Sequence, residues 1–259
     1  GRNIASKLSS KNILNEIAGK KFNDLDEKYQ RKIRRSTIPL MEFKQLTPGD
    51  FSSKYLIFER INTGSDKLNA MQIRKSLAYG EFMINLYKYA NSDENYLNLF
   101  TVSQIKKDIH VEAFLRFLAI TDLVYGKIQI KRKGIKNILD EYCELCRNKN
   151  ISEERIKNFF KILHELLEIF GEKNIFRRVN SDEEYEGVFN IGILEALLGT
   201  IIEENISIKK DIEKEYKAVM RRVYDDSILD KKPNPFSVNT GTEEMIKKRY
   251  EITKEILGV

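Results

Sequence analysis

Apolar residues recur at three- and four-residue steps through most of this chain, which is the spacing of one face of an α-helix. The clearest example starts at Ser152, a residue type that caps helix N-termini, and ends at Gly171, a residue type that terminates helices. An unbroken apolar stripe lies between these two residues: Ile156, Phe159, Phe160, Leu163, Leu166, Leu167 and Phe170. The pattern predicts one long amphipathic helix here.

The same periodicity predicts helices over several other segments, at residues 6–18, 22–35, 47–61, 70–89, 109–125, 135–147, 208–225 and 243–257. The segment 188–202 differs from these because it is apolar on nearly every side, as in a helix buried at the centre of a domain. Its small residues Gly192, Ala196 and Gly199 would let a neighbouring helix approach closely.

Only the segment 36–43 predicts a strand, since apolar and polar residues alternate there and β-branched residues lie at its start. Pro39 favours an edge position or a strand start. The rest of the sequence offers this strand no convincing partner. We therefore predict a mainly α fold, with a small α/β region over residues 1–90 and a multi-helix domain over residues 91–259.

The segment 58–74 carries the most specific pattern in the chain. A predicted helix ends at the polar turn Asn62-Thr63-Gly64, and a second helix starts soon afterwards. Asn69 as N-cap and Gln72 three residues later form a capping box. Free N–H groups at a helix start and the nearby Arg74 would suit a phosphate-binding turn, although the residues by themselves more often indicate a structural corner. The alternative is a well-capped helix–loop–helix corner that binds no ligand.

This segment also resembles the signature of the N-terminal domain of GmrSD-type restriction endonucleases, a prokaryotic defence family with a core similar to the ParB/sulfiredoxin fold. Ten residues agree with that signature in order and spacing: Phe58, Glu59, Arg60, Asn62, Thr63, Gly64, Leu68, Asn69, Ile73 and Arg74. Ser65 departs from it by replacing a second glycine, and Gln72 departs from it by replacing a glutamate. By this resemblance, the region 1–90 would be a partial ParB-like α/β domain.

Members of that family carry an Asp-Gly-Gln-Gln-Arg motif upstream and an HNH-type nuclease half downstream. These 259 residues contain neither, so we expect a fragment or one half of a split protein. The resemblance implies a regulatory or sensing module of a DNA-restricting phage defence system, which binds nucleotide or DNA phosphate and controls a separate nuclease domain or subunit. In the complete protein it also implies a nucleoside triphosphate with a divalent metal ion.

By the same resemblance, one wall of the phosphate site would consist of Arg60, Asn62, Thr63, Gly64 and Arg74. The absent upstream motif would form the other wall. The resemblance assigns no catalytic residue to this chain, and we expect no nucleotide hydrolysis by these residues alone.

The charge distribution adds a second set of candidates. The net charge of +6 is a mild basic excess, but the segments 31–35 and 127–136 contain several basic residues and no acidic ones. Candidate nucleic-acid contacts are therefore Arg34, Arg35, Lys131, Arg132 and Lys133. The alternatives are a solvated basic loop, or a non-enzymatic helical scaffold that binds a protein partner or non-specific DNA through these segments.

Two isolated charges stand inside otherwise apolar helices. Arg116 is the only Lys or Arg between Lys107 and Lys127, and Glu195 is the only acid between Glu186 and Glu203. An unpaired buried charge costs several kcal/mol, so each needs a partner or solvent. We predict that Arg116 and Glu195 pair with each other across the helical core, in a structural role.

Several kinds of chemistry are disfavoured. Cys143 and Cys146 form the only C-x-x-C pair, and with just two histidines, His110 and His164, the chain has no pattern typical of a zinc site. No Walker A sequence is present. No apolar run approaches about 18 residues, so the sequence predicts no transmembrane helix, and we expect a cytoplasmic protein.

Overall fold

The computed structural model describes residues 16–37, 40, 42, 52–62 and 68–259. The chain divides into two compact units, Gly1–Leu46 and Thr47–Val259, and each is considered by itself. Within the described residues the fold is mainly helical, as predicted, with twelve α-helices and a single two-stranded sheet.

The first unit contains a 3-10 turn, Phe22–Asp24, and the helix α1, Glu27–Arg34. One continuous helix over 22–35 was predicted. It is broken because the backbone is extended at Leu25 and Asp26, where Leu25 turns its side chain into the small interior of this unit. Most of the predicted helix 6–18 lies outside the described residues.

The predicted strand 36–43 is also only partly covered. Its described residues are Ser36, Thr37, Leu40 and Glu42, and none of them is in a strand. The remaining four positions lie outside the described residues, and the ParB-like reading of this region stays a prediction.

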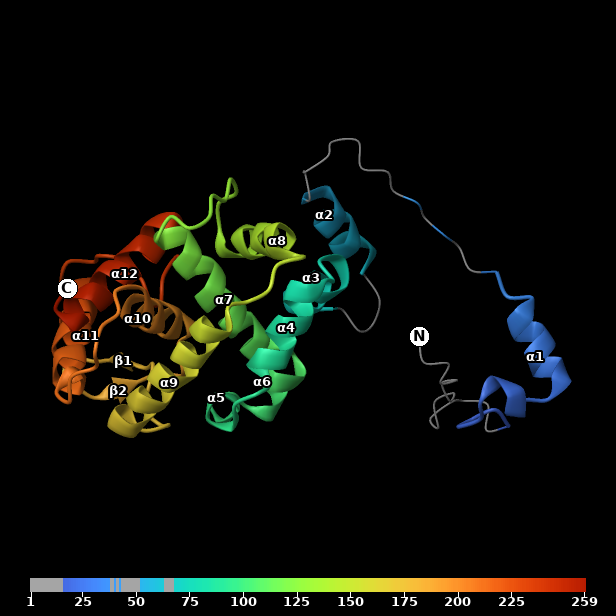
Figure 1. Ribbon diagram of the computed structural model, residues 1–259, viewed down its shortest axis with the longest axis horizontal. Helices are drawn as coiled ribbons and strands as arrows, with labels where there is room; N and C mark the ends of the chain where they lie inside the picture. Colours follow the sequence, from blue (N-terminus) through green and yellow to red (C-terminus); the bar gives the residue numbers. More distant parts are fainter. Residues whose placement is uncertain (1–15, 38–39, 41, 43–51, 63–67) are drawn as a thin grey trace. The chain divides into compact units, whose positions relative to one another are not determined.

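The described residues of the second unit form eleven helices and one small hairpin. Figure 1 labels these elements. The helices are α2 Ser52–Ile61, α3 Ala70–Leu77, α4 Glu81–Ala90, α5 Glu94–Asn98, α6 Val102–Lys106, α7 Ile109–Val124, α8 Ile135–Cys146, α9 Glu153–Phe170, α10 Ile191–Glu203, α11 Ile212–Leu229 and α12 Glu243–Leu257. The hairpin pairs β1, Arg178–Val179, with β2, Tyr185–Glu186, in antiparallel register.

Helix α7 runs through the middle of this unit and packs against α3, α4 and α8 on one side and α10 and α12 on the other (Figure 1). It is apolar on nearly every side, and so is α10, which also packs against α9 and α12. Aromatic rings from three helices, Tyr96, Phe114 and Phe159, meet edge to face beside them. A polar side chain on the buried faces of α7 or α10 therefore has to find its partner inside the protein.

Two predictions about helix packing are confirmed. Helix α9 begins at Ser152, whose Oγ accepts a bond from the Arg155 N–H, and ends at Gly171 with φ of +71°. On α10, a Cβ placed on Gly199 would lie 2.5 Å from Thr121 Oγ1 and 2.9 Å from the Tyr250 hydroxyl. The glycine is therefore what allows α7 and α12 to approach α10 so closely.

The predicted helix over residues 70–89 is wrong, because the chain breaks into α3 and α4 at residues 78–80. A Cβ placed on Gly80 would lie 2.5 Å from the carbonyl oxygen of Arg147, which also accepts a bond from the Phe82 N–H at 3.1 Å. The break is thus fixed by a contact with the end of α8, far away in sequence, and local periodicity cannot reveal it. Helix α11 is also displaced, by four residues at both ends relative to the predicted 208–225.

Candidate functional site

The corner between α2 and α3 contains the segment 58–74, which resembles the GmrSD-type signature. Its predicted helix cap at Asn69 is confirmed. Asn69 Oδ1 accepts a bond from the Gln72 N–H at 3.0 Å, and Gln72 Oε1 accepts one from the Asn69 N–H at 3.0 Å. Asn62 Nδ2 donates to the Leu68 carbonyl at 3.2 Å, which ties the two ends of the connecting loop together. Thr63 and Gly64 lie outside the described residues. Asn62 therefore has the structural role expected of a residue that closes a helix–loop–helix corner.

Arg74 is buried, and protein groups contact its guanidinium. Only 1% of its surface is exposed, and its guanidinium lies between two carboxylates, with Nε 2.7 Å from Asp140 Oδ1 and Nη1 2.9 Å from Glu112 Oε2. Nη2 donates to the Lys136 carbonyl at 3.4 Å. An incoming phosphate would have to displace both carboxylates to reach this side chain. In this arrangement Arg74 ties α3 to α7 and α8, while Arg60 is exposed at the end of α2.

The acidic partners of Arg74 differ in their environments. Burial raises the pKa of the Asp140 carboxyl, and the nearby Arg74 charge opposes that increase. Glu112 is 26% exposed in its side chain, against 6% for Asp140. The network is therefore open to solvent at one edge.

Helix α8 connects this corner to the basic segment. Lys136, in the first turn of α8, forms an ion pair with Glu59 of α2 at 2.6 Å. Near the other end of α8, Glu144 accepts a bond from the Tyr55 hydroxyl of α2 at 3.0 Å. Two candidates that were independent in the sequence are thus joined along one helix.

The basic segment itself leads directly into α8. Lys131 and Lys133 are exposed and Arg132 is half-buried. The N-cap of α8 is Gly134, which provides no side-chain cap, and the first turn holds no acidic residue. The segment borders a hollow of about 310 Å³, lined by Leu123, Val124, Ile130, Lys131, Arg132, Lys133, Gly134, Ile138, Glu243, Ile246 and Lys247. Positive charge therefore gathers around a recess between α7, α8 and α12.

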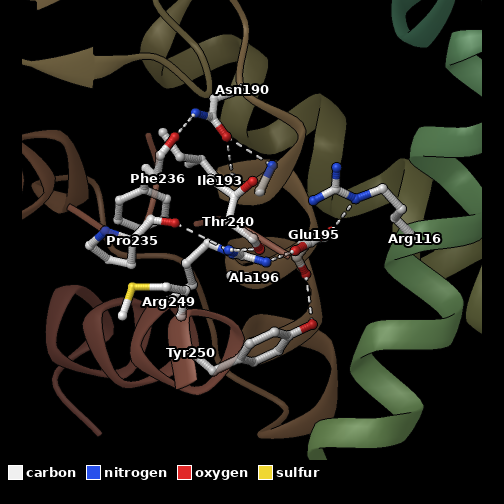
Figure 2. A network of polar contacts seen from close by, with 12 residues as sticks. Arg116, Asn190, Ile193, Glu195, Ala196, Pro235, Phe236, Thr240, Arg249 and Tyr250 are labelled. Carbon is white, nitrogen blue, oxygen red and sulfur yellow. Dashed lines mark hydrogen bonds and ion pairs between the residues drawn. The ribbon is translucent and has the colours of Figure 1, made fainter. Parts of the chain in front are cut away.

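The predicted pair of Arg116 and Glu195 is confirmed, with Arg116 Nε 2.7 Å from Glu195 Oε2. Figure 2 shows that the Glu195 carboxylate also has a second partner, Arg249 of α12. Arg249 Nη2 lies 2.6 Å from Glu195 Oε1, and both of these side chains are fully buried. One carboxylate therefore holds α7, α10 and α12 together.

Arg249 was missed by the sequence analysis because α12 is rich in charged residues. The available signal was its spacing, since Arg249 lies four residues after Met245 and four before Thr253, both of which are buried. Its Nη1 donates to the carbonyls of Pro235 at 3.1 Å and Thr240 at 2.8 Å (Figure 2).

Asn190 completes this network from the start of α10 (Figure 2). Its Oδ1 accepts bonds from the N–H groups of Gly192 and Ile193, and its Nδ2 donates to the Phe236 carbonyl at 2.8 Å. The loop between α11 and α12 is thus held by Arg249 of α12 and by Asn190 at the start of α10. Because its central pair is fully buried, this network fits a structural role.

The cysteines and histidines do not form a site. Cys143 and Cys146 are free and buried, and burial raises the pKa of both thiols. His110 is buried with Nε2 3.2 Å from Asn91 Oδ1, and His164 lies 2.8 Å from Asp93. Within the described residues, no group of three His, Cys, Asp or Glu side chains could hold a metal ion.

No helix among the described residues is long and apolar enough to cross a membrane. In comparisons with known proteins, the chain matches no family model, no curated protein and no solved structure. The resemblance to the GmrSD-type signature consequently rests on the ten residues of segment 58–74.

Proposed function

We propose that this chain is a phosphate-binding regulatory module, acting on nucleotide or DNA, of a GmrSD-like prokaryotic restriction system. The observation that carries the proposal is the junction at α8, where the resembling segment and the basic segment meet. Lys136 binds Glu59 at 2.6 Å, and Arg74 binds both Asp140 and the Lys136 carbonyl. A change at the basic segment would therefore reach α2 and α3 through direct contacts.

The geometry favours a different distribution of roles from the one that the resemblance implies. Lys131 and Lys133 are exposed and lie beside a helix start without a side-chain cap, so they are suited to contact phosphate oxygens. Arg74 acts as a positioning residue that holds α8. Catalysis would belong to the separate nuclease domain or subunit, and this chain alone would turn over no nucleotide.

A second candidate function is a scaffold that binds a protein partner. The observation that favours it is the outer face of α2, where Leu56 and Ile61 are each 49% exposed. Exposed aliphatic side chains on one short helix are a modest feature, since single apolar residues are common on protein surfaces. The phosphate-binding proposal has the broader support of charge, position and connectivity.

The test is the salt dependence of binding to a duplex DNA of fixed length. We expect the double variant Lys131→Ala/Lys133→Ala to bind more weakly, and the slope of log K against log salt to fall by about 2, as expected for two lost phosphate contacts. The matched control is Lys209→Ala/Lys210→Ala, which removes two adjacent exposed lysines at the start of α11 and should leave the slope unchanged. Equal slopes and affinities for all three proteins would refute the proposal.

A further inference from the structure

The hollow between α7, α8 and α12 combines two properties that a plain backbone-binding surface does not need. Its floor is aliphatic, formed by Leu123, Val124, Ile130, Ile138 and Ile246. Its rim carries four cationic side chains and one carboxylate: Lys131, Arg132, Lys133, Lys247 and Glu243. A ligand that fills it would therefore present both an apolar part and a negative charge.

The single carboxylate is already neutralised within the protein. Glu243 lies 2.9 Å from Lys247, and the charges of Lys247 and Lys133 lower the pKa of Glu243. It is therefore ionised at neutral pH and paired with the cation of its own helix. The exposed Lys131 and Lys133 leave the rim with an excess of positive charge.

The recesses of the described residues differ in their charge balance. Another recess of about 260 Å³, beside the start of α11 and the end of α12, is lined by Asp211, Glu215 and Glu255 with Lys209 as its one cation. The two recesses are similar in size and opposite in charge. A third recess, of about 270 Å³, is also basic, but two of its cations are paired with carboxylates, Arg155 with Asp122 and Lys127 with Glu203. A basic surround does not simply follow from the net charge of the chain, because the recess beside α11 lacks it.

We infer that this hollow binds a single nucleotide unit, with its ring against the aliphatic floor and its phosphate at Lys131 and Lys133. The inference rests on the proposed function and narrows its ligand. A base-paired duplex presents phosphates on the outside and keeps its bases stacked, so it cannot use an aliphatic recess. At about 310 Å³ the hollow lies at the lower end of the range of ligand cavities, roughly 300–1,000 Å³, which suits one nucleotide.

The same chemistry can come from two sources, a free nucleotide or an unpaired nucleotide within DNA. Isothermal titration of the full chain with AMP, adenosine, inorganic phosphate, a single-stranded oligonucleotide and the matching duplex separates them. We expect AMP or the single strand to bind more tightly than phosphate, adenosine and the duplex. Preference for AMP identifies a free ligand, and preference for the single strand identifies an unpaired base.

A floor variant tests the apolar contact without removing a charge. Val124→Thr replaces one methyl group by a hydroxyl of similar size and should weaken AMP or single-strand binding by about tenfold, while phosphate and duplex binding stay unchanged. The matched control is Val188→Thr, at a residue that is 81% exposed. Ile130→Thr, at a half-buried floor position, is a second variant should Val124→Thr unfold.

The outcomes distinguish this inference from the proposed function. If the Lys131→Ala/Lys133→Ala variant loses duplex binding but AMP and the single strand bind no better than phosphate, the hollow is not a nucleotide site and the proposed function survives. If AMP binds and both floor variants bind it as tightly as the wild type, the inference is also overturned. If those lysines affect no ligand at all, both proposals fail.

Discussion

Two buried ion networks among the described residues are inversions of each other. Near α3, one guanidinium, Arg74, lies between the carboxylates of Glu112 and Asp140. Near α12, one carboxylate, Glu195, lies between the guanidinium groups of Arg116 and Arg249. Both networks use α7, because Glu112 and Arg116 are one helical turn apart on its surface.

The difference between them is access to solvent. The central pair of the α12 network, Glu195 and Arg249, has no exposed surface, whereas the α3 network opens at Glu112. Low dielectric strengthens the attraction in the closed network and also increases the cost of breaking it. Rearranging the open network costs less free energy, because solvent can replace the broken contacts. We therefore expect the closed network to contribute more to stability and the open one to rearrange more readily.

The largest effect is expected from Glu195→Gln, which breaks the closed network. It leaves the buried Arg249 and the nearly buried Arg116 without a counter-charge, so the free energy of unfolding should fall by about 3–5 kcal/mol in urea titrations. The control is Glu255→Gln, which removes an exposed Arg222–Glu255 pair between α11 and α12 and should cost less than about 1 kcal/mol. Similar losses in both variants would contradict this expectation.

A smaller effect is expected from Arg74→Met, which breaks the open network. Asp140 can take up a proton and Glu112 can reach solvent, so we expect a loss of about 2–3 kcal/mol at pH 7. Since burial raises the folded-state pKa of Asp140, the folded variant binds a proton more tightly than the unfolded chain, and its deficit should shrink as the pH is lowered toward 5.

The same variant also tests whether Arg74 contacts the ligand. The double variant Arg74→Met/Asp140→Leu removes both buried charges and should recover part of the lost stability. If Arg74 only positions α8, this protein should still bind duplex DNA. Loss of binding in a stably folded double variant would show instead that Arg74 contacts phosphate directly.

His110, also on α7, is a buried titratable residue that belongs to neither ion network. Burial lowers its pKa below 6.5, so between the folded and unfolded values the unfolded chain holds more protons than the folded protein. The free energy of unfolding should therefore be highest above about pH 6.5 and fall as the pH decreases toward 5. His110→Gln should flatten this dependence. A wild-type stability independent of pH across this window would disprove the assignment.

The sequence predicted features that depend on local physics or on simple charge balance. The caps at Ser152 and Asn69 are local, and the Arg116–Glu195 pair follows because a lone charge in an apolar helix needs a partner. Arg249 was hidden among the other charges of α12. The break at Gly80 depends on a backbone contact with Arg147, which no local pattern encodes.

The candidate site was predicted less completely than the helices. Arg74 looked like a ligand contact because it follows a helix start, but its partners Glu112 and Asp140 are 38 and 66 residues away in sequence. The basic residues of segment 131–133 were identified from charge alone. Their position beside an aliphatic recess depends on the packing of α7, α8 and α12, which the sequence does not display.

The way α12 is held has one consequence for the chain as a whole. Arg249 binds Glu195 and the carbonyls of Pro235 and Thr240, while Asn190 binds the Phe236 carbonyl. Non-covalent contacts from α12 and from the start of α10 thus hold the segment from Pro235 to α12 in place. The chain near the exposed Lys231 and Lys232 contributes little to these contacts. Helix α12 therefore binds to the remainder of the unit through non-covalent contacts, as a separate peptide would.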